Sequence, residues 1–138
     1  MLQIELMRWE QARAAASRIR YAVFVEEQGV PVEIELDEHD AQCIHALAFD
    51  GGAALGTGRL LPDGHIGRMA VLREFRGRGV GSAILAKLIE AAAQRGDRKV
   101  LLSAQVHALA FYRAHGFSAE GEVYQDAGIP HQTMRRRL

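Results

Sequence analysis

A short stretch rich in glycine and arginine, Arg76-Gly-Arg-Gly-Val-Gly-Ser82, carries the clearest chemical signal in the sequence. It follows an apolar run, Ile66 to Leu72, and precedes a helical pattern, so it is expected where a strand passes into a helix. Glycine permits positive φ and close approach of a ligand to the backbone, and the first amides of a helix have no partner within it. Such a loop suits the oxygens of a phosphate or pyrophosphate group.

The elements that must position this loop are indicated by hydrophobic periodicity and by turn residues. Helices are expected at Trp9 to Val25, from Val80 to about Gly96, and at His107 to His115. The acidic segment 26–42 contains Pro31 and is expected to form a loop or a short irregular helix. A turn is expected at residues 126–130, between the last two strands. The predicted strands are residues 2–7, 43–49, 54–61, 65–72, 99–106, 117–124 and 132–137.

This order, β-α-βββ-α-β-α-ββ, predicts an α/β fold with one mixed central sheet of about seven strands and helices on its faces. Residues 65–106 form a strand–helix–strand unit with a right-handed crossover, which makes the fourth and fifth strands parallel. A ligand would lie at the carboxyl ends of those strands, beside the glycine-rich loop. With 138 residues, the chain is expected to be a single domain, 1–138.

The composition narrows the class of protein. Lysine plus arginine and aspartate plus glutamate number 17 each, and this zero net charge argues against binding nucleic acid by bulk charge. Cys43 is the only cysteine, which excludes a disulfide within the chain. No signal-peptide pattern is visible, and no apolar run approaches the roughly 20 residues of a membrane span. We therefore expect a cytoplasmic protein without nucleic-acid or membrane partners.

The loop differs from the two commonest nucleotide-binding motifs. No Gly-Lys-Ser/Thr ends it, so it is not a P-loop. The spacing of its three glycines fits a dinucleotide fingerprint poorly, and no acidic partner for a ribose follows about 20 residues on. The pattern begins instead with an arginine, as Arg76-x-x-Gly79-x-Gly81.

That pattern, after a fourth strand, is similar to the pyrophosphate-binding motif of the GNAT superfamily of acetyl-CoA-dependent N-acetyltransferases. About 30 residues downstream, Ala110-Phe-Tyr-Arg-Ala-His-Gly-Phe117 resembles a second motif of that superfamily. The resemblance covers essentially the whole chain. It is closest to the ElaA-like branch, on Arg20 to Gln28, Glu35-x-Asp37-x-x-Asp40, residues 66–68, residues 104–107 and residues 123–131.

The resemblance implies that acetyl-CoA is the cosubstrate, that no metal takes part, and that the acetyl group passes directly to an amine in a ternary complex. The acceptor would be a small-molecule amine or an exposed protein amine, and a homodimer is a family-level expectation. Strands four and five would splay apart, often at a bulge. Arg73 stands where the family often has proline, and His107 where many members have asparagine. The residues expected to bind acetyl-CoA are Met69, Ala70, Val71, Arg76, Gly77, Arg78, Gly79, Val80, Gly81, Ser82, His107 and Phe111.

Acetyl transfer needs a group that protonates the leaving thiolate and a group that deprotonates the amine. The resemblance assigns the acid role to Tyr112. For the base, Glu27, Asp37 and His131 are candidates on the acceptor side, and two further histidines, His45 and His65, stay open. Arg20 and Arg68 are expected to pair with the acidic segment or to hold an acidic group of the acceptor, and Cys43 is expected to be a packed thiol.

Three other interpretations stay open from the sequence. An acyl-homoserine-lactone synthase would also show Arg20 and Phe24 followed by the acidic pattern at 35–40. An acetyl-CoA-binding module without catalysis would keep the same loop. A nucleic-acid-binding domain would use Arg73, Arg76, Arg78 and Arg135 to Arg137, although the net charge disfavours it. The negative charge of segment 26–40 also hints at a cationic acceptor.

Overall fold

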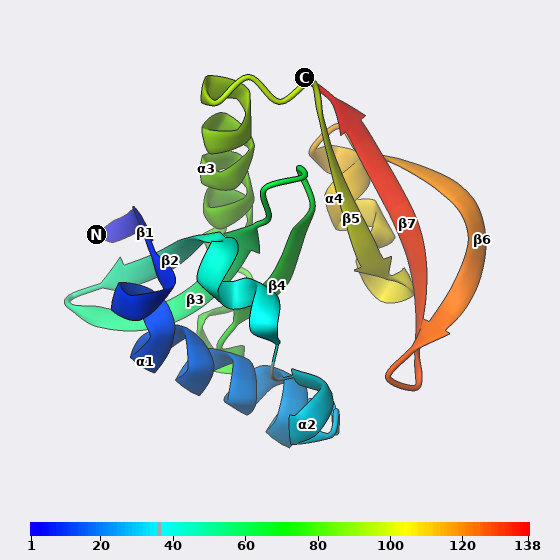
Figure 1. Cartoon of the computed structure of the whole chain (residues 1–138). Helices are drawn as coiled ribbons and strands as arrows, with labels where there is room; N and C mark the ends of the chain where they lie inside the picture. Colours follow the sequence, from blue (N-terminus) through cyan, green and yellow to red (C-terminus); the bar gives the residue numbers. More distant parts are fainter. Residues whose placement is uncertain (36) are drawn as a thin grey trace.

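The computed structural model describes residues 1–35 and 37–138, arranged as two antiparallel sheets that meet at an angle (Figure 1). The first sheet has the strand order β1-β2-β3-β4 and the second has the order β5-β7-β6. The first contains β1 (Leu2–Met7), β2 (Ile44–Asp50), β3 (Ala53–Leu60) and β4 (Ile66–Val71). The second contains β5 (Lys99–Gln105), β6 (Ser118–Asp126) and β7 (Ile129–Arg137).

The prediction of one central sheet of seven strands is therefore wrong. In the described chain, β4 and β5 touch through a single parallel bridge between His65 and Leu101. Beyond this bridge the strands separate, and in Figure 1 they diverge like the arms of a V. The backbone edges of β4 and β5 that would have completed one sheet therefore face a gap.

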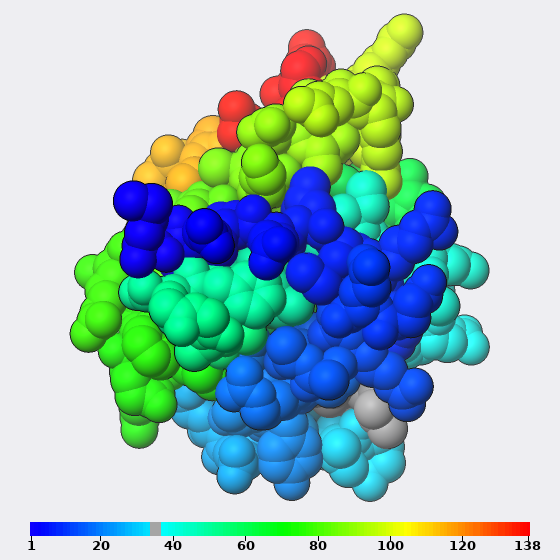
Figure 2. Space-filling view, turned by 90° about the vertical axis from the view of Figure 1, so that its left-hand side faces the viewer, coloured from blue at the N-terminus to red at the C-terminus, as the bar shows by residue number. Residues whose placement is uncertain are grey.

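The helices cover both faces of the first sheet. Helix α1 (Trp9–Arg20) packs on one face, and α3 (Val80–Gln94) packs on the other. The predicted apolar stripes are confirmed, because Ala12, Ala16, Ile19 and Val23 are buried under α1 and Ile84, Leu85, Leu88, Ile89 and Ala92 are buried along α3. Figure 2 shows the N-terminal strand and helix, in blue, crossing one face of the molecule beside the teal β2–β3 hairpin.

Helix α3 can lie close to the sheet because β3 carries glycines beneath it. A Cβ added at Gly58 would stand 2.6 Å from the Met69 sulfur and 3.0 Å from Leu88 Cδ1, and one at Gly56 would stand 2.9 Å from Ile84 Cδ1. Larger residues would push the helix outward, since protein interiors are close-packed. The position of the loop before α3 is thus set by tight packing under the helix.

The single helix predicted at Trp9 to Val25 is in fact two segments. After α1 the chain widens into a π-helical segment, η1 (Tyr21–Glu27), in which the Gln28 amide bonds to the Val23 carbonyl five residues back. Tyr21, Val23, Phe24 and Val25 are aromatic or β-branched residues, which crowd an ordinary helix. Wide turns of this kind often lie at functional sites.

The segment predicted as a loop or irregular helix contains α2 (Val32–Glu35) and a 3₁₀ turn, η2 (Glu38–Gln42), which confirms the second possibility. The resemblance motif at residues 35–40 lies partly outside the described side chains, since that of Glu35 is not described. Two further short 3₁₀ turns are η3 (Arg73–Phe75) and η4 (Val106–Ala108), and the latter leads into α4 (Leu109–Ala114).

The last hairpin is tighter than predicted. Asp126 pairs with Ile129, so only Ala127 and Gly128 form the turn, both with positive φ (54° and 76°). Two left-handed residues make the turn type that suits a two-residue hairpin. Strand β7 consequently begins at Ile129, three residues before the predicted start, and places His131 within the sheet instead of in an overhanging turn.

Candidate active site

A cavity of about 1010 Å³ occupies the gap between the two sheets. Its wall contains segments that are distant in sequence: η1, β4, the glycine-rich loop, β5, α4 and the β6–β7 hairpin. It brings together the predicted site residues Glu27, Met69, Ala70, Val71, Arg76, Gly77, Gly79, Val80, Gly81, Ser82, His107, Phe111, Tyr112 and His131.

The glycine-rich loop ends directly in the first turn of α3. Gly77 and Gly79 have φ of 78° and 81°, and a Cβ at either position would meet no atom within 4 Å. Gly79 caps the 15-residue helix, so the amides that follow point outward at its positive end. The Ser82 hydroxyl is 2.9 Å from Nε2 of His115, which ties the loop to the end of α4. The loop has the geometry of an anion cradle.

Arg78 and Arg76, both predicted to bind acetyl-CoA, contact protein groups in this structure. The Arg78 guanidinium stacks over the Phe75 ring at 5.6 Å and is not part of the described cavity wall. Arg76 donates from Nε to the Val71 carbonyl and from both terminal nitrogens to the Glu27 carboxylate, at 2.6 and 2.7 Å. This double hydrogen bond raises the pKa of Arg76 and lowers the pKa of Glu27. A carboxylate held in this way is a poor base.

Strand β4 carries a bulge at the point where it leaves β5. Thr57 pairs with Ala70 and Arg59 with Gly67, so Arg68 and Met69 together face the single residue Gly58. Arg68 has φ of 50°, which is uncommon for a residue other than glycine and is characteristic of strained functional positions. A bulge re-aims the strand after it. Met69, Ala70 and Val71 then run along the cavity with one backbone edge toward it.

Tyr112 lies in α4 on the wall next to the glycine-rich loop. Its ring packs edge-on against Phe111 at 5.0 Å and against Phe117 at 5.9 Å. Burial raises the pKa of Tyr112 to about 12. The hydroxyl therefore keeps its proton throughout the neutral range and is suited to donate to a developing negative charge.

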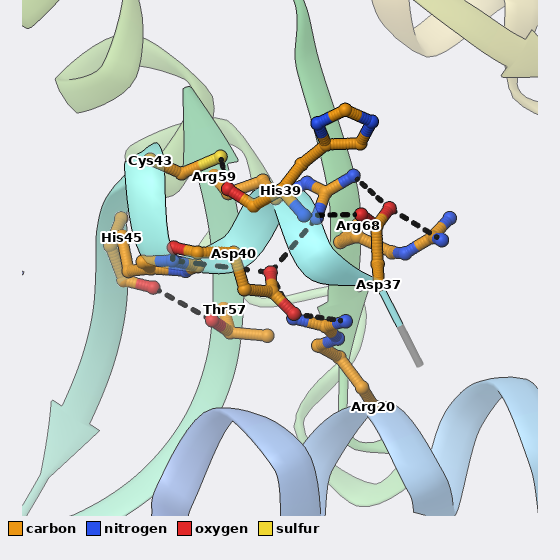
Figure 3. A network of polar contacts seen from close by, with 10 residues as sticks. Arg20, Asp37, His39, Asp40, Cys43, His45, Thr57, Arg59 and Arg68 are labelled. Carbon is orange, nitrogen blue, oxygen red and sulfur yellow. Dashed lines mark hydrogen bonds and ion pairs between the residues drawn. The ribbon is translucent and has the colours of Figure 1, made fainter. Parts of the chain in front are cut away.

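Two acids of the acidic segment, Asp37 and Asp40, are paired with arginines (Figure 3). Asp40 accepts from Arg20 at 2.9 and 3.1 Å and from Arg59 at 2.9 Å. Asp37 accepts from Arg59 at 2.8 Å and from Arg68 at 3.2 Å. Structural pairing, one of the two roles predicted for Arg20 and Arg68, is confirmed.

This network makes Asp37 a poor candidate for the general base. Burial alone would raise the pKa values of Asp37 and Asp40, but hydrogen bonds from arginine outweigh it and lower both. Among the described residues, Asp37 is not part of the cavity wall. The charge of the acidic segment, which hinted at a cationic acceptor, is at these two positions matched by guanidinium groups.

Two of the remaining candidates have structural positions. His45 is buried beside the Trp9 ring, its Nε2 is 2.8 Å from the Asp40 carbonyl, and burial lowers its pKa. Cys43 donates to the His39 carbonyl, and burial raises its pKa, which confirms a packed, unreactive thiol. His65 lies on the cavity wall, but it is exposed and paired with Asp63 at 3.0 Å.

Side-chain amides link the end of η1 to β5 of the second sheet. Nε2 of Gln28 donates to Oε1 of Gln105 at 3.2 Å, and Nε2 of Gln105 donates to Oε1 of Gln28 at 2.9 Å. Nε2 of His107 is 2.6 Å from the same side-chain oxygen of Gln105. No role was predicted for these glutamines, although both lie within segments that resemble the ElaA-like branch. Only the fold shows that residues 77 positions apart are in contact.

The chain matches the family described as "Acetyltransferase (GNAT) domain" over residues 11–138. It belongs to this family of acetyltransferases, and it is an enzyme of the N-acetyltransferase type. Within the family it falls in the ElaA-like branch.

Named relatives support this placement. The "Uncharacterized N-acetyltransferase YjcF" of Bacillus subtilis is 39% identical over 131 residues, which cover 92% of this chain and 94% of the relative. An acyl-CoA N-acyltransferase from Pseudomonas aeruginosa has a TM-score of 0.88 at 34% identity, covering 99% of both chains. The crystal structure of Escherichia coli ElaA has a TM-score of 0.88 at 30% identity, with the same coverage.

A CoA-dependent acyl-homoserine lactone synthase, BjaI, also resembles the chain, with a TM-score of 0.82. At 18% identity this likeness shows a shared fold and does not favour lactone synthesis.

Proposed function

We propose that the protein transfers an acetyl group from acetyl-CoA directly to the amine of a small molecule or of an exposed protein site. One observation carries the proposal. A single cavity brings together an anion cradle at a helix N-terminus, the open backbone edge of β4 and the protonated phenol of Tyr112. These are the groups needed for a long phosphorylated thioester.

Two adjoining backbone segments would hold the donor. The amides of Gly77 to Ser82 suit its pyrophosphate, and the backbone of Met69, Ala70 and Val71 can pair with the pantetheine arm as an added strand would. Phe111 and His107 flank this path on the other side. Arg76 contributes a charge-assisted contact once it turns from Glu27 toward the phosphates.

The thioester would supply the acyl group, and Tyr112 would assist its departure. In the proposed reaction a backbone amide of β4 stabilises the oxygen of the tetrahedral intermediate. The Tyr112 hydroxyl donates to the sulfur as the carbon–sulfur bond breaks. The phenol is protonated at neutral pH, so it can donate a hydrogen bond to the sulfur as negative charge develops there.

Two measurements with the intact protein test the proposal. Isothermal titration calorimetry with acetyl-CoA should show binding. A thiol-release screen with acetyl-CoA and a panel of aliphatic, aromatic, amino-acid and peptide amines should identify at least one acceptor. Absence of binding would contradict the proposal outright. Binding without thiol release from any amine would instead favour an acetyl-CoA-binding module.

The lactone-synthase alternative needs different substrates. Acyl-carrier-protein thioesters with S-adenosylmethionine should give no lactone product by mass spectrometry. Lactone formation faster than acetyl transfer to every amine of the panel would replace the proposal by this alternative.

A further inference from the structure

We propose that His131 is the general base that takes the proton from the acceptor amine. This inference rests on the proposed function and identifies a residue for its unassigned step. Three features of His131 support this role: the face of the sheet on which it lies, the hydrogen bond that fixes its ring and the access of its second nitrogen to the cavity.

His131 faces the side of the cavity that is away from the glycine-rich loop. In the second sheet it lies opposite Gln105 of β5 and Tyr124 of β6. Residues directly opposite on neighbouring strands share a face, and Gln105 contacts Gln28 of η1. His131 therefore points to the side on which η1 lies.

The other face of the same sheet carries the donor side. Along β5 and β7 a second set of residues alternates with Gln105 and His131 and so lies on the other face: Leu102, Ala104 and Met134. These residues belong to the core that includes Phe111 and Tyr112 of α4. His131 and Tyr112 thus approach one cavity from opposite faces of the second sheet. This arrangement suits acyl transfer, since the attacking amine and the departing sulfur occupy different positions around the carbonyl carbon of the tetrahedral intermediate.

A backbone hydrogen bond fixes the proton on the His131 ring. Nδ1 is 2.7 Å from the Ile129 carbonyl oxygen, which can only accept. Nδ1 must then carry the hydrogen, and in the neutral ring Nε2 is left with a lone pair. The Tyr124 ring stacks on the imidazole at a centroid distance of 6.2 Å and holds its plane.

Nε2 is available to a ligand. The side chain is only 9% exposed, it forms part of the cavity wall, and no group in the described chain hydrogen bonds to Nε2. The cavity wall carries these titratable or charged groups: Glu27 of η1, Arg59 of β3, His65 and Arg68 at β4, Arg76 of the loop, His107 after β5, Tyr112 of α4 and Asp126 of the hairpin; Tyr124 of β6 stacks on the ring itself. Of the two acids, Glu27 is held by Arg76 and Asp126 is exposed at the hairpin tip.

The proposed step balances as follows. The amine nitrogen forms a bond to the thioester carbon, and Nε2 of His131 accepts the proton that the nitrogen gives up. The carbon–sulfur bond breaks, its electron pair leaves on sulfur, and Tyr112 supplies the proton to that sulfur. The products are the amide and the CoA thiol, and solvent returns His131 and Tyr112 to their starting states.

The first test reads the imidazole directly and needs no acceptor. Nitrogen-15 histidine NMR at mildly alkaline pH, with the His131→Gln variant used to assign the signal, should show a neutral ring protonated at Nδ1. A neutral ring protonated at Nε2 would overturn the proposal, because that nitrogen would have no lone pair for the amine.

The second test is kinetic and uses acetyl-CoA with the amine that releases thiol fastest in the screen. His131→Gln should lower kcat about 100-fold near neutral pH, the low end of general-base effects. The loss should shrink as pH rises, because more of the amine is then deprotonated in solution. The Kd for acetyl-CoA should stay within about twofold. His39→Gln, at an exposed histidine outside the cavity wall, is the matched control and should behave as wild type.

The outcomes separate this inference from the proposed function. Unchanged kcat in His131→Gln, or weaker acetyl-CoA binding in proportion to the lost rate, would overturn the base assignment while leaving acetyl transfer intact. If no amine releases thiol, the proposed function fails, and the NMR measurement still decides where the His131 proton lies. Should His131→Gln fold poorly, His131→Asn provides a second variant for the kinetic comparison.

Discussion

The two walls of the cavity are constructed in different ways. The proposed donor wall contains residues 69–71, 76–77, 79–82, 107–108 and 111–112, and most of the contacts proposed there are to backbone groups. The acceptor wall presents side chains from three separate segments, chiefly Gln28, Gln105 and His131. Backbone groups are fixed by the fold, whereas side chains change with single substitutions. The comparison explains why the donor can be proposed from a motif while the acceptor cannot.

The largest expected effect is a loss of acetyl-CoA affinity at the donor wall. Gly79→Trp should weaken acetyl-CoA binding by about 1000-fold or more, about 4 kcal/mol, because an indole would cover the amides that follow Gly79. Calorimetry measures this directly. Gly96→Trp is the matched control, since Gly96 follows the other end of α3 with similar positive φ (93° against 81°) and similar open space. Equal losses in both variants would indicate strain in α3 instead of a blocked site.

The next effect concerns the ion-pair network behind the acceptor wall. Asp40→Ala should destabilise the fold by roughly 3–5 kcal/mol, because it leaves the buried guanidiniums of Arg20 and Arg59 without this carboxylate. Chemical denaturation measures the change. Asp50→Ala removes an exposed pair with the N-terminus and should cost less than about 1 kcal/mol. Similar losses for the two variants would contradict a structural role for the network.

The same network predicts how stability depends on pH. The pKa values of Asp37 and Asp40 are lowered in the folded state, so their contribution is complete above the ordinary carboxyl pKa of about 3.9. It is lost as pH falls through the lower folded values. Denaturation midpoints should therefore be steady near neutrality and drop below about pH 4. Asp40→Ala should show a shallower drop, and an identical profile would argue against this linkage.

A smaller effect is expected on the rate of acetyl transfer when the hydroxyl of Tyr112, in the donor wall, is removed. Tyr112→Phe should lower kcat about 100-fold, about 2.7 kcal/mol, while the Kd for acetyl-CoA stays within about twofold. The ring keeps its packing on Phe111 and Phe117, so only the hydroxyl is removed. Tyr21→Phe, at an exposed tyrosine, is the control. A parallel loss of affinity and rate would make Tyr112 a binding residue.

The smallest effect concerns the contact that joins the two walls. Glu27→Gln should tighten acetyl-CoA binding about threefold, since Arg76 no longer has to leave a carboxylate before it reaches phosphate. Stability should change by less than about 1 kcal/mol, because the pair is partly exposed. Glu26→Gln removes the same charge one residue away. Weaker binding in Glu27→Gln would mean that the pair supports the loop.

The donor wall was predictable because its signals are local. The glycines at 77–81 indicate a junction between a strand and a helix. The apolar periodicity of α3 predicts where that helix starts and which side of it is buried. These signals need only the rules of backbone conformation and burial. The same locality explains why the buried stripes of α1 and α3 were predicted correctly.

The acceptor wall and the split sheet depend on contacts that no local pattern contains. In the described chain β5 pairs with β7 along its length but meets β4 at the His65–Leu101 bridge alone, and the bulge at Arg68 and Met69 follows this bridge. The pairing of Arg76 with Glu27, 49 residues earlier, is likewise a contact that no local pattern shows. The turn predicted at residues 126–130 is shorter in the structure, because Ala127 and Gly128 alone form it and His131 lies in β7.

A crystal structure of the protein with acetyl-CoA tests the central claim most directly. It should show the pyrophosphate on the amides of residues 77–82 and the pantetheine arm along Met69 to Val71. The thioester sulfur should lie within hydrogen-bond reach of Tyr112, with the carbonyl carbon exposed toward His131. A donor bound outside the gap between β4 and β5, or a thioester directed away from both side chains, would contradict the account.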